Sequence, residues 1–122
     1  MLRVTLSLVV FALILGCASR RPESEVERGR AAVVAALDGW KANEPPAKLK
    51  SRPDPVEFTE ELRSTHTLLD YTLGKVDDSD KDVIRYTVTL KLKDKKGKLT
   101  DREVVYAVAF KSPVIVARDP YY

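Results

Sequence analysis

The sequence predicts an α+β fold in which one N-terminal helix packs on an antiparallel sheet of about four strands, after a cleaved signal peptide. Apolar residues recur every three or four positions over residues 24–42, which is typical of one amphipathic helix. From residue 56 onward apolar and polar residues alternate, as in strands with one buried face. Ahead of the helix, the apolar run 4–15 is too short to cross a membrane and fits a secretory signal instead.

The helix is expected to begin at Ser24, because Glu27 three residues later completes a Ser-x-x-Glu capping box. Acidic residues in its first turn stabilise the helix, because they lie at the positive end of the helix dipole. Its apolar stripe consists of Val26, Gly29, Val33, Leu37 and Trp40. The sequence NEPP at 43–46 ends the helix, since proline cannot continue it, and a proline-rich connector follows over 47–55.

Three segments alternate clearly enough to predict strands with one inward row each. The inward rows are Leu69, Tyr71 and Leu73; then Ile84, Tyr86, Val88, Leu90 and Leu92; then Val104, Tyr106, Val108 and Phe110. Charged turns between them, the second containing Gly97, predict consecutive hairpins. Residues 113–117 fit a further short strand, and residues 56–66 fit a short strand followed by a helical turn or a loop.

This order of elements is similar to that of the cystatin-like and NTF2-like group, in which a curved sheet wraps a helix near the N-terminus. The resemblance covers most of residues 24–118 and depends on element order alone. Related folds often hold ligands between helix and sheet, so the resemblance implies a pocket there. Its candidate lining is Trp40, His66, Asp70, Tyr71, Tyr86 and Tyr106, and the alternative for the aromatic residues is simple core packing.

The N-terminal segment carries Arg3, the apolar run and then Gly16 and Cys17. The order Ile14-Leu15-Gly16-Cys17 resembles the lipobox of bacterial lipoproteins, although Leu15 is bulkier than the residue usual there and Ile14 replaces the usual Leu. The resemblance implies that a signal peptidase cuts between Gly16 and Cys17, after the thiol has received a diacylglyceryl group. An ordinary signal peptide cut nearby, leaving a free cysteine, is the alternative.

Lipidation would divide the chain into a signal peptide (1–16), a lipidated tether (17–23) and one α+β domain (24–122). Two or three acyl chains hold a protein on a membrane effectively permanently. By the same resemblance, Ala18 after the cysteine implies the outer membrane, facing the periplasm, in a cell with two membranes. A single cysteine excludes an internal disulfide and a cysteine-based zinc site.

The formal net charge of +3 is too small an excess to indicate a nucleic-acid partner. One strongly basic stretch stands out, KLKDKKGK at 91–98, with lysines at Lys91, Lys93, Lys95, Lys96 and Lys98. Beside a membrane it is a candidate contact for anionic head groups or an anionic envelope polymer. Lysines on a hairpin also keep strand edges soluble, and this is the alternative interpretation.

Two further patterns invite a chemical interpretation. His66 and Asp70, four residues apart, are a candidate oriented general base, but no nucleophile or Gly-x-Ser-x-Gly turn accompanies them. Asp78, Asp80 and Asp82 alternate as calcium ligands do, yet the glycine and the acid that an EF-hand loop requires are missing. A structural histidine and a solvated turn are the favoured interpretations, and we expect no metal and no cofactor.

The sequence therefore predicts a membrane-anchored envelope lipoprotein whose domain binds an envelope protein or a small ligand, and not an enzyme. Two alternatives stay open. One is an NTF2-like enzyme with a pocket around His66 and Asp70. The other is a pocketless interaction module that assembles through a sheet edge or face.

Overall fold

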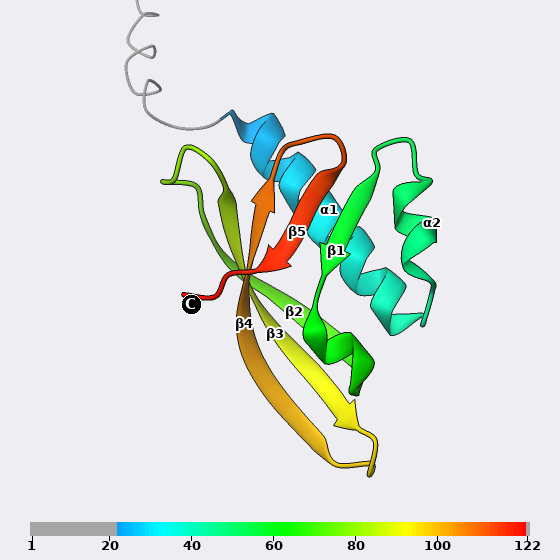
Figure 1. Cartoon of the computed structure of the whole chain (residues 1–122). Helices are drawn as coiled ribbons and strands as arrows, with labels where there is room; N and C mark the ends of the chain where they lie inside the picture. Colours follow the sequence, from blue (N-terminus) through cyan, green and yellow to red (C-terminus); the bar gives the residue numbers. More distant parts are fainter. Residues whose placement is uncertain (1–21, 122) are drawn as a thin grey trace, which may run out of the picture.

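The computed structural model describes residues 22–121, so Cys17 and the rest of the predicted signal peptide and tether up to residue 21 lie outside the described residues. The elements, in chain order, are α1 (Glu23–Lys41), α2 (Pro46–Lys50), β1 (Val56–Thr59), the 3₁₀ helix η2 (Glu61–Ser64), β2 (His66–Asp77), β3 (Ile84–Asp94), β4 (Leu99–Ala109) and β5 (Val114–Arg118). They form an α+β structure in which α1 packs on one face of a single sheet (Figure 1).

The sheet has five strands in the order β1-β5-β4-β3-β2, and it is mixed. Strands β2 to β5 pair antiparallel, as expected, whereas β1 pairs parallel with β5, with Val56 opposite Val114. The predictions of about four strands and of a wholly antiparallel sheet were therefore wrong. A parallel pair needs a long connection, and here the whole β2–β4 meander supplies it, which no local pattern around residue 56 could reveal.

The helix begins one residue earlier than predicted and without the expected capping box. Pro22 occupies the N-cap position, no side chain caps the first turn, and the carbonyl of Pro22 accepts from the backbone N–H groups of Glu25 and Val26. Proline has a fixed φ, here −59°, which suits the residue at which a helix begins. The acidic first turn, Glu23 and Glu25, is as predicted.

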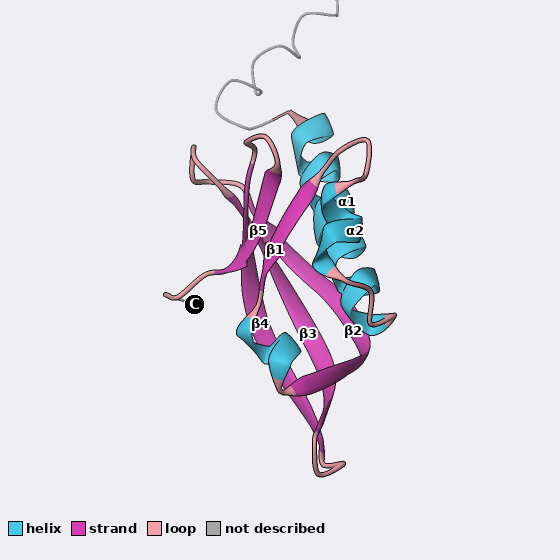
Figure 2. Cartoon of the chain, turned by 45° about the vertical axis from the view of Figure 1, so that its right-hand side comes forward, coloured by secondary structure: helices cyan, strands magenta, loops and turns pink. Residues whose placement is uncertain are grey.

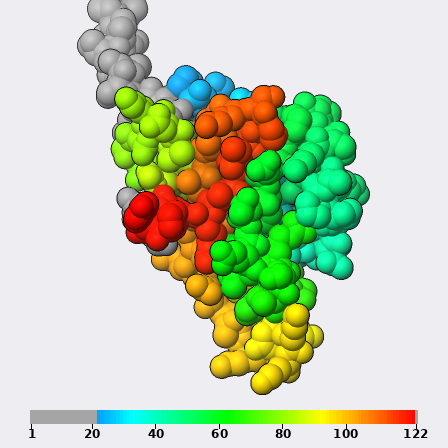
Figure 3. Space-filling model, in the orientation of Figure 1, coloured from blue at the N-terminus to red at the C-terminus, as the bar shows by residue number. Residues whose placement is uncertain are grey.

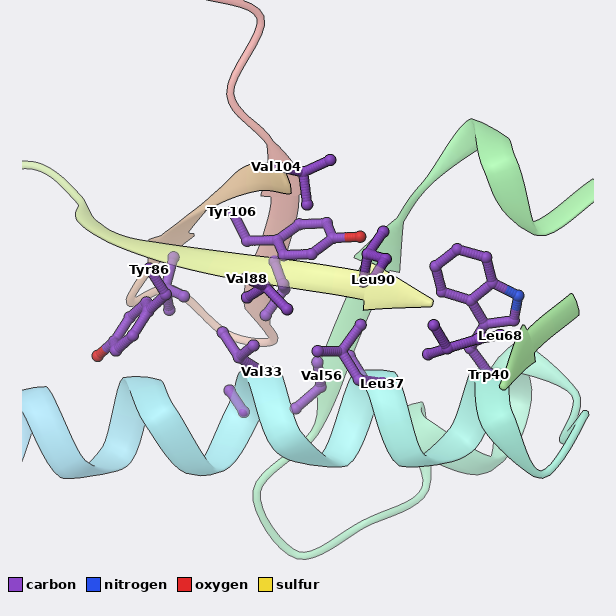
Figure 4. Packing of buried hydrophobic residues seen from close by; sticks show 14 of the residues in the cluster. Val33, Leu37, Trp40, Val56, Leu68, Tyr86, Val88, Leu90, Val104 and Tyr106 are labelled. Carbon is purple, nitrogen blue, oxygen red and sulfur yellow. The ribbon is translucent and has the colours of Figure 1, made fainter. Parts of the chain in front are cut away.

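The buried face of α1 matches the predicted stripe. Val33, Leu37 and Trp40 point from the helix toward the sheet and meet side chains of β1 to β4 (Figure 4). The predicted inward rows of β3 and β4 are also confirmed, since their residues from Ile84 to Leu92 and from Val104 to Val108 are buried at alternate positions. Figure 2 shows α1 lying along this single face of the sheet. One helix therefore covers one sheet face and leaves the other to solvent.

Strand β2 departs from simple alternation. Leu68 is buried and pairs opposite Leu92, whereas Leu69, predicted to face inward, is 38% exposed. The pairing then resumes with Asp70 opposite Lys91, so Leu69 is one extra residue inserted between the two pairs. Such a bulge moves the side chains that follow it, up to the next register shift between Leu73 and Val76, to the other face, which is why period-two reasoning chose the wrong leucine.

The proline-rich connector also contains structure that was not expected. Pro46 opens α2, whose Leu49 is buried against the core, so the segment covers the β1 end of the sheet. The short strand and the helical turn predicted within 56–66 are present as β1 and η2.

Helix α1 approaches β3 closely at Gly29. A methyl group at this position would lie 2.2 Å from the hydroxyl oxygen of Tyr86, and that hydroxyl donates to the carbonyl of Val26 at 2.7 Å. Gly39 in the same helix has open space by comparison, because its nearest neighbour would be 3.7 Å away.

We expect Gly29→Ala to lower the free energy of unfolding of the full chain by about 2 kcal/mol through overpacking. The matched variant Gly39→Ala is expected to raise it by as much as about 1 kcal/mol, because alanine favours the helix. Urea unfolding followed by circular dichroism measures both, and equal stabilities of the two variants would contradict the close contact.

Candidate functional site

The aromatic residues proposed for an internal pocket fill the space between α1 and the sheet. Trp40, Tyr86 and Tyr106 are 4%, 2% and 0% exposed, and each polar atom has a partner. The indole N–H of Trp40 donates to the carbonyl of His66 at 3.2 Å, and the Tyr106 hydroxyl donates to Glu60 at 2.7 Å. Tyr71 is only half-buried; burial and its hydrogen bond to Asp38 raise its pKa to about 12. These rings serve packing.

His66 and Asp70 have separate surroundings. The Nδ1 atom of His66 lies 2.7 Å from Oγ1 of Thr65, while Asp70 accepts from the backbone N–H of Tyr71 and pairs with Lys41 at 3.5 Å. The backbone hydrogen bond and Lys41 hold the pKa of Asp70 below its usual value. Because of the bulge at Leu69, the two side chains are on opposite faces of β2, with His66 opposite Asp94 and Asp70 opposite Lys91.

The basic stretch forms the end of the β3–β4 hairpin, and its five lysines are exposed. Figure 3 shows this hairpin end protruding at one end of the molecule, with the start of α1 at the other. The turn is well held: Asp94 Oδ1 accepts from the backbone N–H groups of Lys96 and Lys98, and Gly97 adopts a φ of 87° that favours glycine. These donors, from Lys98 first, lower the pKa of Asp94.

A groove of about 360 Å³ brings the hairpin together with three other elements. The end of α1, η2, the start of β2 and the end of β3 all contribute to it. It is lined by Trp40, Asn43, Arg63, Ser64, Thr65, His66, Thr67, Lys93, Asp94 and Lys95. We call it the hairpin groove. It joins two residues of the predicted pocket, Trp40 and His66, to two of the predicted basic contacts, Lys93 and Lys95, whereas Asp70, Tyr71, Tyr86 and Tyr106 do not line it.

Arg63 is the residue of this groove that sequence reasoning missed. Its Nη2 donates to the carbonyl of Glu44 at 2.8 Å, and its guanidinium lies 5.8 Å from the centre of the Phe58 ring. These two contacts fix the side chain, which keeps further N–H donors on the same planar group. The only signal in the sequence was an arginine in the ambiguous segment 56–66, with nothing to place it near the hairpin.

The groove is positively charged. Arg63, Lys93 and Lys95 contribute three positive charges and Asp94 one negative charge, which gives +2 from these four side chains. Hydroxyl groups of Ser64, Thr65 and Thr67 add polar donors beside these cations. This composition fits an anionic ligand.

A second hollow, of about 460 Å³, lies between η2, the end of β5 and the uncovered part of β4. Glu60 lies at its inner end with a side chain only 1% exposed, bonded to the N–H of Leu62 and to the Tyr106 hydroxyl, and 3.6 Å from Arg118. Burial and the bond to Glu60 raise the pKa of Tyr106. The hydrogen bonds and the ion pair within this network satisfy the buried polar groups, so its role is structural.

The aspartate-rich turn 77–82 is also held by its own contacts. Asp77 accepts from Ser79, and Asp80 accepts from the backbone N–H of Asp82 and pairs with Arg85 at 3.4 Å. Over residues 22–121, no group of three or more His, Cys, Asp or Glu side chains is arranged to hold a metal ion.

Comparisons with protein families, with characterised proteins and with solved structures give no match to the chain. Among the described residues, no helix combines the length and the apolar character needed to span a membrane. The hairpin groove and the N-terminal sequence are therefore the two features of this chain that bear on its function.

The contribution of a buried ion pair to stability can be tested at Asp119, which lines the second hollow and pairs with Arg85. Asp119, whose side chain is 5% exposed, accepts from Arg85 Nε at 2.6 Å and from the N–H of Tyr121. Burial alone would raise the pKa of Asp119, but the hydrogen bonds from Arg85 and Tyr121 outweigh it and the pKa is lowered. A carboxylate with a depressed pKa contributes stability above its unfolded pKa, and this stability is lost as the pH falls through the folded value.

We therefore expect Asp119→Asn to lower the free energy of unfolding at pH 7 by about 3 kcal/mol, because it leaves Arg85 without this charged partner. The difference from the unsubstituted chain should shrink as the pH is lowered below about 4. Urea titrations at several pH values measure this. Asp101→Asn, at an exposed position of β4, is the control and should change stability by less than about 0.5 kcal/mol; a similar loss in both variants would count against the buried pair.

Proposed function

We propose that this chain is an exported lipoprotein, anchored through acylated Cys17 in the outer membrane and facing the periplasm, whose domain binds an anionic component of the cell envelope. The anchor is supported by the sequence Ile14-Leu15-Gly16-Cys17 behind a short apolar run. The binding role is supported by the basic hairpin groove, where cations from η2 and β3 converge. That convergence is the observation that carries the proposal.

The position of the groove agrees with such an anchor. Five residues, 18–22, lie between Cys17 and the start of α1 at Glu23, and the six Cα–Cα steps from Cys17 to Glu23 reach about 20 Å when fully extended. The helix itself is about 28 Å long, and the β3–β4 hairpin extends past its far end (Figures 1 and 2). The tether thus joins the domain at one end, and the basic groove is at the other end, where it can meet a partner beyond the surface of the bilayer.

The resemblance to the cystatin-like and NTF2-like group belongs to the same proposal, supported by the packing of one long N-terminal helix on the sheet. An NTF2-like enzyme is the less favoured alternative. In this chain the space between helix and sheet is filled by Tyr86, Tyr106 and their neighbours, and His66 and Asp70 face apart. Binding at the surface fits these contacts better than chemistry in an internal pocket.

Anchoring is tested by Cys17→Ala. We expect this variant to incorporate no radiolabelled palmitate and to leave the membrane fraction, because the thiol is the only site for the thioether. The neighbouring Ser19→Ala variant should label normally. Labelling of Cys17→Ala at the level of the unsubstituted chain would overturn the lipobox assignment.

Binding is tested with the chain as bait in solubilised envelope extracts. A variant with Lys95→Glu and Lys96→Glu is expected to lose most of the captured anionic material, since both charges at the hairpin end are reversed. The control carries Lys48→Glu and Lys50→Glu on α2, which lie outside the groove. If the hairpin variant captures the same material as the unsubstituted chain, the lysines of the hairpin only keep the protein soluble.

A further inference from the structure

We infer that the hairpin groove is a binding site for a phosphate group, with Arg63, Lys93, Lys95 and His66 as its principal contacts. The inference rests on the proposed binding function of this end of the domain and names its ligand chemistry. These residues belong to two segments, 63–66 and 93–95, and the pairing of β2 with β3, which sets His66 opposite Asp94, brings the two segments together.

Arg63 provides the fixed part of the site. A guanidinium offers a planar fork of N–H donors that matches phosphate oxygens, and one held from behind loses little freedom on binding. Arg63 is held in this way by the carbonyl of Glu44 and the ring of Phe58. Its half-buried position at the groove wall also reduces the screening that weakens a fully exposed charge.

His66 and its neighbours provide neutral donors. Thr65 Oγ1 lies 2.7 Å from Nδ1 of His66 and also donates to the carbonyl of Leu62 at 3.4 Å, so Nε2 is the ring nitrogen left to contact an anion, as a donor when it carries a proton. The hydroxyl of Thr67 also lines the groove. The tetrahedral oxygens of a phosphate group can accept from more of these donors at once than the two coplanar oxygens of a carboxylate can.

The two lysines complete the charge. Lys93 lies opposite Thr67 in the sheet and Lys95 follows in the hairpin turn, and both are exposed and line the groove. The single acid, Asp94, directs one carboxylate oxygen to the backbone N–H groups of Lys96 and Lys98, so the turn occupies it. A volume of about 360 Å³ exceeds what one phosphate needs, which leaves room for the organic part of an ester.

The hairpin supplies a matched pair of variants. Lys95 lines the groove, whereas the adjacent Lys96, which is also exposed, does not. Lys95→Glu and Lys96→Glu make the same change of charge in the same turn, and neither side chain has a role in the core. A difference between them therefore reports the groove and not the general charge of the hairpin.

The experiment uses the full-length chain in neutral detergent, titrated with inorganic phosphate at constant ionic strength. We expect saturable shifts of the backbone amide resonances of Thr65, His66 and Thr67. Lys95→Glu should weaken binding by roughly fivefold or more, and Lys96→Glu by less than about twofold. Equal weakening in both variants, or amide shifts that do not saturate, would overturn the site as an adventitious charge effect.

A second arm identifies the source of the phosphate group. The same variants are mixed with vesicles of phosphatidylglycerol and phosphatidylcholine, and with vesicles of phosphatidylcholine carrying no net charge. Binding to the anionic vesicles that depends on Lys95 and is displaced by phosphate identifies a lipid head group; phosphate binding without such vesicle binding identifies a soluble phosphate ester. Loss of phosphate binding with intact capture from envelope extracts would reject the phosphate site while leaving the proposed binding function.

Discussion

The close packing of α1 on one face of the sheet is the constraint on which the rest of the structure depends. The helix approaches so closely at Gly29 that the Tyr86 ring lies against its backbone and its hydroxyl bonds to the carbonyl of Val26. Farther along, Val33, Leu37 and Trp40 meet the inward rows of the strands (Figure 4). Because the large side chains fill the space between α1 and the sheet, ligand binding depends on the surface of the domain.

The length of the hairpin follows from the same arrangement. Strands β3 and β4 have eleven residues each, whereas β5 pairs only with Tyr106–Ala109, so the hairpin end extends beyond β5. Most residues of that extension are charged or polar, although Leu99 is exposed there, and the hairpin groove joins it to η2 and the start of β2. The hairpin groove forms where the covered part of the sheet ends, which explains why its lining combines a buried ring, Trp40, with exposed lysines.

Two buried carboxylates, Glu60 and Asp119, form ionic contacts at the second hollow. Glu60 with Tyr106 and Arg118, and Asp119 with Arg85, join β1, β4, β5 and β3 where the strands leave the core. Each buried carboxylate has charged and neutral donors, so its burial does not leave an unpaired charge. These contacts hold the N-cap of η2 and the C-terminal segment in place, and η2 in turn carries Arg63 to the wall of the hairpin groove.

Local patterns were enough to predict the helix, the inward rows of β3 and β4, and the short elements β1 and η2. They failed where pairing with a strand distant in the sequence determined the local structure. The bulge at Leu69 depends on how β2 pairs with β3, and the parallel pairing of β1 depends on β5, which comes more than fifty residues later. The N-cap of α1 at Pro22 was missed because the capping pattern at Ser24 offered a competing signal two residues along.

The sequence by itself determined that this chain has one amphipathic helix, a sheet with one buried face, a cluster of lysines on a hairpin and a single cysteine behind an apolar run. These are properties of spacing and residue type, which are local. Only the tertiary structure decided that His66 and Asp70 face apart and that Arg63 and His66 share a groove with Lys93 and Lys95. The reason is physical: a candidate site needs side chains from separate elements, and their meeting depends on strand register and helix packing, which no single segment specifies.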